Sequence, residues 1–552
     1  MHPNRIHRRA QQAEPVGTGT AKWRRWVSGC WSALLQFWSK VQISHRGKYS
    51  IERLQALEEY CKSASRLRVA IVCCLTPIPA FLLLLALECI PLRDPSEGWK
   101  ANYPTWIRSE IVSYSVAQGL LLQVTGMIPG IPMAPATSVL VALCSSASCM
   151  ALLIAITAQL VYPLPFAIVL SVMPFVIIFP IFFGLAIGRR PFLIVPNLAL
   201  QLQRQLLVLF AQATLVLVYP TFNAVFMSLS LTGQLMALSL LPAVKILIKN
   251  IVARASGHLE DYIPEIVAFS VDVFNSLYVS ACMQSSTRWL TTSLVMAFDA
   301  AQAVLAARDI QRRTTAVQRW NPSGMWQSPQ GILSDALEVC AHPELLSATA
   351  FQKIRLRSPI KLEISERNRG VLSSLVRHRA KMRGLGSANN RRRRTSVLFS
   401  GPQTRFKSQK TLLIHQTLKM LFQCEYFILV EYIECAAPLL YAMYSTAIYY
   451  LPNAVYFPQT ANLTEADVAS TALYLFGYAL LESLSFVAFS VVLQRRFGFS
   501  PLYLLAFVLE KQAKQVQGRL FVWIVYILPF PLKHHGVDFT FQFKWIHRSA
   551  EP

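Results

Sequence analysis

Long apolar runs, separated by short polar stretches, dominate the pattern of this chain. Residues 69–87, 165–187 and 468–493 consist mostly of valine, leucine, isoleucine and phenylalanine. Each run has about the 20 residues that a helix needs to cross ~30 Å of hydrocarbon. Backbone groups in lipid must be hydrogen-bonded within the segment, and the short alternating strands of a membrane barrel are absent from the sequence. The pattern therefore predicts membrane-spanning helices.

The runs predict an all-α, polytopic helical membrane bundle of about ten transmembrane helices. The predicted spans are residues 69–87, 111–128, 137–159, 165–187, 206–223, 225–247, 265–284, 288–307, 421–446 and 468–493. A further apolar stretch, 520–532, has only thirteen residues. It is either a short eleventh span or a re-entrant or interfacial piece, and each alternative places the C-terminus on a different side. Aromatic and polar residues alternate over 537–545, which predicts a short strand.

Composition agrees with this pattern and charge orients it. Hydrophobic residues make up 54% of the chain and charged residues 15%, against about 25% charged in a typical globular protein. The net charge of +25 comes from two segments, 1–68 with net +9 and 308–419 with net +16. Basic segments beside apolar spans mark cytoplasmic loops, so the N-terminus is expected in the cytoplasm. The expected location of the protein is the plasma membrane or an endomembrane. Anionic inner-leaflet lipid is the expected partner of both segments, and nucleic acid is not.

Four regions follow from these features. Residues 1–68 form a basic cytoplasmic N-terminal region, in which 23–41 has the pattern of an amphipathic helix, either lying on the inner leaflet or packed on the bundle. Residues 69–307 hold spans one to eight, 308–419 form a basic cytoplasmic loop, and 420–552 hold the last two spans, the short apolar segment and the C-terminal tail. The first thirty residues lack the apolar core of a signal peptide, although their arginine content is also typical of a transit peptide.

The basic loop 308–419 is predicted to be largely disordered, because it mixes Pro-, Ser- and Gly-rich sequence with runs of arginine. Arg393 and Arg394 lie just before Ser396, a spacing that suits a basophilic kinase and makes Ser396 a phosphorylation candidate. The alternative is a solvated tether attracted to anionic lipid. Asn462 begins the only acceptor sequon and falls in a predicted outer loop, so it is the glycosylation candidate.

Ionisable and polar residues within the spans indicate where function would lie, because an acid at mid-membrane costs about 2.5 to 3.5 kcal/mol. The candidate intramembrane polar site consists of Asp272, Asn275, Asp299, Gln302, Glu431, Glu434 and Glu482. If these groups face a shared cavity, they would bind a cation or take up protons. The alternative is that each is bonded to a neighbouring helix for packing, with Lys245 pairing one of them near the cytoplasmic face. Prolines such as Pro77 predict kinks or broken helices in the spans.

The sequence lacks the signatures of several other classes of protein. All ten histidines lie outside the predicted spans and no CxxC pair is present, so no metal site and no cofactor are expected. The phosphate-binding loop GxxxxGK[ST] and the GxSxG and HExxH motifs are absent from the sequence. The protein is therefore not expected to be an enzyme.

Several segments resemble those of a family of uncharacterised multi-pass transmembrane proteins from oomycetes. They are residues 49–54 (YSIERL), 75–79 (LTPIP), 98–103 (GWKANY), 431–435 (EYIEC) and 536–541 (GVDFTF). The resemblance covers most of the chain outside the basic loop. It implies a fold and a membrane location but assigns no activity and no functional residue.

Two functions compete on this basis. The first is a transporter-like protein for a small solute or ion, either proton-coupled or not, with the acidic residues as its polar core. The second is a non-transporting membrane scaffold or receptor that recruits partners or lipid through the basic loop. Substrate and oligomeric state do not follow from the sequence.

Overall fold

The computed structural model describes residues 42–285, 300–312, 331–346, 351–389, 402–497 and 500–538, apart from a few single positions, together with Phe543 and Trp545. Every regular element in these ranges is a helix, which confirms the all-helical fold class. The expected amphipathic helix at 23–41 lies outside the described residues. So do Asp299, Ser396 and Asn462.

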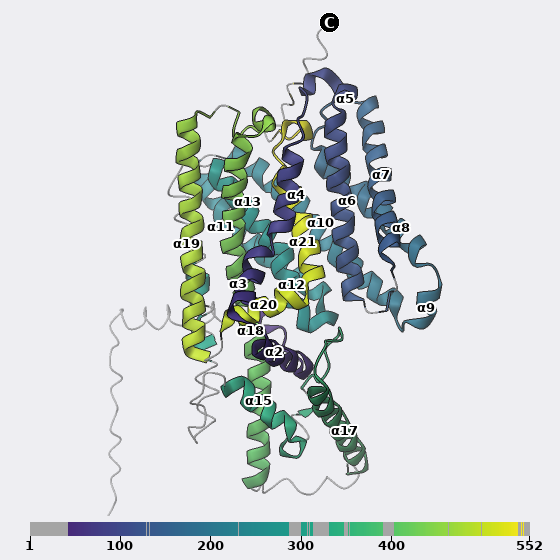
Figure 1. Cartoon of the computed structure of the whole chain (residues 1–552), viewed down its shortest axis with the longest axis vertical. Helices are drawn as coiled ribbons and strands as arrows, with labels where there is room; N and C mark the ends of the chain where they lie inside the picture. Colours follow the sequence, from purple (N-terminus) through teal and green to yellow (C-terminus); the bar gives the residue numbers. More distant parts are fainter. Residues whose placement is uncertain are drawn as a thin grey trace, which may run out of the picture.

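The first half of the chain builds much of an upright bundle and one of the helices below it (Figure 1). Its elements are η1 (Ile43–His45), α2 (Ile51–Ser63), α3 (Arg66–Leu75), α4 (Ile78–Glu88), η2 (Pro95–Glu97), α5 (Gly98–Ala101), α6 (Tyr103–Met127), α7 (Pro135–Gln159), α8 (Ala167–Ile187), α9 (Arg190–Ile194), α10 (Leu198–Ser228) and α11 (Leu231–Ala255). Helices α3 and α4 are consecutive and separated only by Thr76 and Pro77, because the proline interrupts the hydrogen-bond ladder.

The second half completes the bundle and adds further helices below it in Figure 1. Its elements are η3 (Gly257–Tyr262), α12 (Ile263–Val267), η4 (Ala268–Asp272), α13 (Val273–Ser285), α15 (Gly331–Ala341), η5 (Pro343–Leu345), α17 (Glu366–Asn389), α18 (Pro402–Tyr449), η6 (Pro452–Tyr456), α19 (Glu465–Phe497), α20 (Pro501–Lys511), α21 (Ala513–Ile527) and η7 (Lys533–His535). Helix α18 runs through both parts, and at 1.5 Å per residue it is about 70 Å long.

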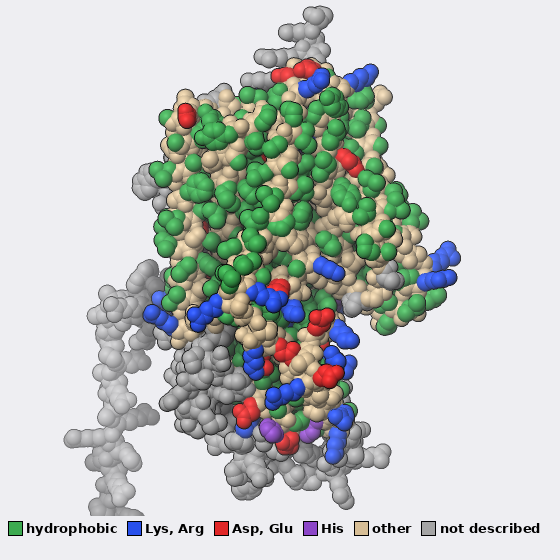
Figure 2. All heavy atoms as spheres, viewed as in Figure 1, with side chains coloured by type: hydrophobic (Ala, Val, Ile, Leu, Met, Phe, Trp, Pro, Cys, Tyr) green, Lys and Arg blue, Asp and Glu red, His purple; other side chains and the backbone are tan. Residues whose placement is uncertain are grey.

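Among the described residues, six helical segments are long and apolar enough to cross a membrane, so the chain is a multi-pass membrane protein. They are Arg66–Glu88, Pro135–Gln159, Ala167–Ile187, Leu198–Phe222, Lys410–Tyr449 and Glu465–Arg495. Apolar side chains cover the visible face of the bundle, and lysine and arginine gather at its lower edge and below it (Figure 2). The expected count of ten is not confirmed. The predicted span 265–284, for example, is divided into α12, η4 and α13 by a turn of π-helix.

The segment 510–534, which contains the short apolar stretch 520–532, connects one end of the bundle with the other. At its beginning, α20 is tied to the start of α3 through Glu510 and Arg68. At its end, His534 Nε2 lies 2.7 Å from the carbonyl oxygen of Arg93, just beyond α4. Because α3 and α4 run consecutively between these two points, α21 connects opposite ends of the bundle. It can be short and partly polar because it packs against α6 and α4.

The described part of the basic loop is folded, so the expected disorder is not confirmed there. Helices α15 and α17 bury Phe351, Ile354 and Leu375. Glu59 of α2 accepts hydrogen bonds from the backbone nitrogen of Ser365, at 2.9 and 3.0 Å, next to the beginning of α17. The loop does contain apolar residues at helical spacing, but its basic composition favours disorder in a prediction from the sequence. The described residues contain no strand, and 539–542 of the predicted strand lie outside them.

Candidate functional site

Two helices and a π-turn bring four charged side chains together inside the bundle. Lys245 and Lys249 lie one turn apart on α11, and both point at Asp272 of η4, with Nζ to Oδ1 distances of 3.3 and 2.6 Å. Lys245 also lies 2.9 Å from Glu434 of α18. Lys249 donates to the Tyr426 hydroxyl of α18 at 2.9 Å. We call Lys245, Lys249, Asp272 and Glu434 the Lys245 cluster.

The Lys245 cluster is electrically balanced and mostly buried, with 15% of the Glu434 side chain exposed. The Asp272 side chain is fully buried, and those of Lys245 and Lys249 are each 9% exposed. Two ammonium groups face two carboxylates, so each buried charge is compensated. Removing one member alone would leave an uncompensated charge in a low-dielectric interior, which costs about 3–5 kcal/mol. The cluster therefore fixes α11, η4 and α18 to one another.

Asp272 ends the π-helical turn η4, and this turn connects the cluster with the other side of the bundle. Turns of π-helix inside α-helices occur often at functional sites, because they turn side chains out of the regular register. Ser270 of the same turn accepts a hydrogen bond from the Gln212 side chain of α10 at 2.6 Å. Gln212 lines a cavity between helices. The single turn η4 thus contacts the cavity wall through Ser270 and the Lys245 cluster through Asp272.

The other predicted site residues in the described ranges lie in α13, α18, α19 and the segment 300–305. Glu431 of α18 accepts a hydrogen bond from Ser485 of α19 at 3.4 Å, on the face where these two helices pack. Glu482 lies one helical turn before Ser485 on α19 and is buried. Asn275 is buried in α13, and Gln302 lies in the segment 300–305. Of the predicted acids in the described ranges, Asp272 and Glu434 therefore lie in the Lys245 cluster, and Glu431 and Glu482 lie where α18 and α19 pack.

A cavity of about 180 Å³ lies between α6, α7, α8, α10 and α21. Its walls are mostly apolar, with aromatic side chains from α8 and α21. Arg108, His534 and His535 line one end of it, near the loop that follows α4. Phe210 lines it as well and is 54% exposed on the outer surface of the bundle, so the cavity reaches the surface that faces lipid.

Arg108 at the polar end is held by a buried carboxylate. Its Nη2 lies 2.8 Å from Glu88 Oε1, which also accepts from the Tyr444 hydroxyl at 3.1 Å. Burial lowers the pKa of His534 to about 4 and that of His535 to about 3, with the nearby Arg108 guanidinium acting in the same direction. Both imidazoles are therefore neutral at pH 7.

Acid is expected to loosen this end of the protein. The folded pKa of His534 is lower than its ordinary value of 6.5, so the unfolded chain binds more protons between pH 6.5 and 4. The stability that depends on neutral His534 is complete above pH 6.5 and falls by about 2 kcal/mol at pH 5. Thermal unfolding of wild type and His534→Gln should differ in their loss between pH 7.5 and 5. His342→Gln, at an exposed site, is the control, and equal losses in all three proteins would contradict the prediction.

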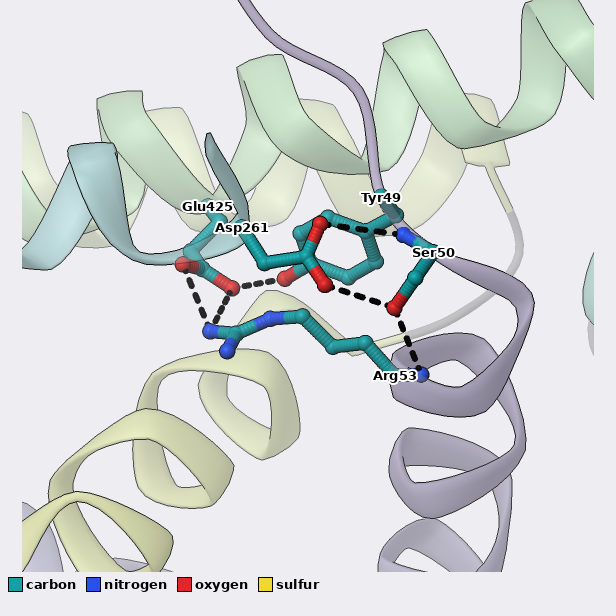
Figure 3. Close-up of polar contacts among 5 residues, drawn as sticks. All are labelled: Tyr49, Ser50, Arg53, Asp261 and Glu425. Carbon is teal, nitrogen blue, oxygen red and sulfur yellow. Dashed lines mark hydrogen bonds and ion pairs between the residues drawn. The ribbon is translucent and has the colours of Figure 1, made fainter. Parts of the chain in front are cut away.

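A second polar cluster joins the bundle to the helices below it (Figure 3). Arg53 of α2 contacts both oxygens of Glu425 of α18 at 2.8 Å, and the Tyr49 hydroxyl donates to the same carboxylate. Ser50 caps the start of α2 and donates to Asp261 Oδ2 at 2.6 Å. We call these five residues the Arg53 cluster. The Arg53 and Glu425 side chains are both fully buried.

Sequence reasoning missed the Arg53 cluster and a third buried pair, Arg519 of α21 with Glu265 of α12. One signal was available. A serine immediately before the first apolar residue of a helical pattern, as Ser50 stands before Ile51, marks a helix start. It predicts the cap but not that the same hydroxyl would also reach a carboxylate more than 200 residues away.

No group of three or more histidine, cysteine, aspartate or glutamate side chains among the described residues could hold a metal ion. Comparison with protein-family models, characterised proteins and solved structures finds no match to this chain. What the sites can do is therefore argued from their own residues.

Proposed function

We propose that this protein is a membrane transporter for a small solute, with the cavity between α6, α8, α10 and α21 as the solute site. The cavity carries the proposal, because a mostly apolar concave site with a few polar groups at one end is the usual form of a small-molecule site. Its position inside a multi-pass bundle favours transport over a reaction in solution. The oomycete resemblance and the cytoplasmic placement of the two basic segments are part of the same proposal.

The Lys245 cluster is the coupling element in this proposal. A proton or cation that binds Asp272 or Glu434 weakens their attraction to Lys245 and Lys249, so the contacts among α11, η4 and α18 change. The π-turn η4 transmits the change to Gln212 at the cavity through Ser270. Solute binding and proton binding would then alter each other's affinity reciprocally.

Flux through reconstituted vesicles tests this function. The full chain is placed in phosphatidylcholine vesicles with four radiolabelled solutes of the same chain length: octyl phosphate, octanesulfonate, octyltrimethylammonium and octyl glucoside. We expect uptake of at least one solute to depend on an inward proton gradient and to exceed uptake by protein-free vesicles. Uptake equal to that of protein-free vesicles for all four would overturn the proposal.

Removing one charge of each sign should separate coupling from folding. The double variant Asp272→Asn with Lys249→Met keeps the cluster balanced, so we expect a folded protein whose uptake no longer responds to pH, at least tenfold below wild type in a gradient. Glu482→Gln, in the other acidic patch, is the matched control and should keep the response. If the double variant responds to pH as wild type does, the Lys245 cluster has no coupling role.

The second candidate function is a scaffold or receptor that does not transport. The observation in its favour is that the basic loop is not a loose tether in its described part. Helices α15 and α17 pack on α2 and α18 and present the exposed side chains of Arg367, Arg377 and Lys381. Such a surface suits anionic lipid or an acidic partner. Uptake at the protein-free level would favour this function.

A further inference from the structure

Among the described residues that line the cavity, two buried groups that can only donate hydrogen bonds have no acceptor, beside the Nδ1 atoms of His534 and His535, which can donate or accept. The two donors are Nη1 of Arg108 and Nε1 of Trp523. Arg108 is 6% exposed and Trp523 is 2% exposed, so neither group reaches bulk solvent. Arginine and tryptophan side chains donate hydrogen bonds and cannot accept them. A molecule that satisfies them must therefore bring oxygen acceptors.

Leaving these two donors buried without an acceptor costs free energy, so binding a molecule that supplies acceptors would be favourable. A buried donor without a partner costs about 1–3 kcal/mol, and native proteins contain few of them. Arg108 is not free to turn away, because its Nη2 is held by Glu88 and Glu88 is held by Tyr444. Nη1, on the other side of the guanidinium fork, is therefore held in place on a residue that lines the cavity.

The unpaired donor of Arg108 favours an anionic ligand, although Glu88 already compensates the guanidinium charge. Of the described residues that line the cavity, only Arg108 carries a formal charge at pH 7, and none is aspartate or glutamate. The two histidines at the same end are neutral. A cationic head would meet a guanidinium with no carboxylate on the cavity wall, whereas an anionic head gains a charge-assisted hydrogen bond.

The remaining walls select an apolar chain attached to that head. Phe175 and Phe179 of α8 stack on one another at 5.8 Å between ring centroids, and both line the cavity. Val522 and Trp523 of α21 line it as well. Phe210, exposed on the lipid-facing surface, marks the side by which a membrane-dissolved molecule reaches the cavity.

We propose that the cavity binds a single-chain amphipathic anion, with its phosphate or carboxylate head at Arg108 and its chain among the aromatic side chains of α8 and α21. The proposal rests on the assignment of the cavity as the solute site and names the class of solute. The head can belong to a soluble alkyl phosphate or to a lysolipid, and the test separates these two sources.

Equilibrium binding to the full chain in phosphatidylcholine nanodiscs tests the proposal, with protein-free nanodiscs subtracted. The probes are radiolabelled octyl phosphate, octyltrimethylammonium, octyl glucoside, inorganic phosphate and lysophosphatidic acid. We expect octyl phosphate to bind at least tenfold more tightly than the cationic and neutral octyl compounds and than inorganic phosphate. A lysolipid that competes with octyl phosphate places the natural source in the bilayer, and one that does not compete places it in solution.

Three variants locate the site. Arg108→Gln should weaken octyl phosphate binding at least tenfold and abolish the preference for the anion. Because Arg108→Gln leaves Glu88 without its partner, Val176→Trp is the second variant, and it fills the cavity from α8 without touching a charge. Ile177→Trp is its matched control, since Ile177 is the next residue, is 64% exposed and does not line the cavity.

Equal affinity for the anionic and cationic octyl compounds, or unchanged binding in Val176→Trp, would overturn this proposal. Its failure is distinct from failure of the transport proposal, because one is measured as binding and the other as flux. Selective anion binding without uptake removes transport and keeps the ligand class. Uptake without a preference for the anion keeps the transport proposal and removes the ligand class.

Discussion

Replacing Arg53 by methionine is expected to prevent the chain from folding. The change leaves Glu425 as a fully buried carboxylate whose remaining described donor is the Tyr49 hydroxyl. Breaking a buried pair from one side costs about 3–5 kcal/mol, a large part of the 5–15 kcal/mol by which proteins are usually stable. The measurement is the yield of monodisperse protein in mild detergent and its unfolding temperature.

The double variant Arg53→Met with Glu425→Met decides whether charge compensation is the reason. It removes both charges and keeps two long apolar side chains, so most of the lost stability should return. Lys62→Met is the control, because Lys62 pairs with Glu58 on the surface with 71% of its side chain exposed. That pair is worth well under about 1 kcal/mol. A single variant as stable as wild type would contradict the expectation.

Replacing Gly119 by valine is expected to separate α6 from α21. A Cβ atom at this position would lie 2.4 Å from the carbonyl oxygen of Gly518, and one at Gly518 would lie 2.6 Å from the carbonyl oxygen of Gly119. The two helices therefore touch backbone to backbone, and neither can yield by rotating a side chain. We expect a loss of about 3 kcal/mol or more and little folded protein.

Gly184→Val is the matched control for Gly119→Val. Gly184 also lies within a helix, α8, so the change in helix propensity is the same, but a Cβ there meets no atom within 4 Å. The readout is the rate of trypsin cleavage in membranes together with the yield after gel filtration. Equal behaviour of the two variants would show that the close approach of α6 and α21 is not required.

The sequence predicts the helical class and the membrane location well, because long apolar runs report directly on contact with lipid. It predicts the number of crossings less well. Helix α21 begins with Lys514, Gln515 and Gln517, and Arg519 follows them, so its mean hydropathy is low. Arg519 is nevertheless fully buried against Glu265. A helix surrounded by protein does not need the composition of a helix surrounded by lipid.

For the candidate site as well, the sequence predicts which residues are involved but not the packing that brings them together. Asp272 and Glu434 stand out as acids in apolar sequence, and a carboxylate partner for Lys245 is among the sequence expectations. Two lysines one turn apart also predict a shared face of α11. The sequence does not say that one turn of π-helix aims Asp272 at both lysines, because that depends on the packing of α12 and α13 on α18.

The position of α21 also fixes the order in which the protein can be assembled. Its partner α6 is made about 400 residues earlier, so the Gly119 face must wait in the membrane while most of the chain is synthesised. A segment that carries Arg519 would leave the translocon for lipid only at considerable cost, unless the slot between α4, α6 and α13 already exists. We therefore expect α21 to enter a site that the earlier helices have already formed. Mutations that delay its entry expose to the quality-control machinery a surface that the mature protein never shows.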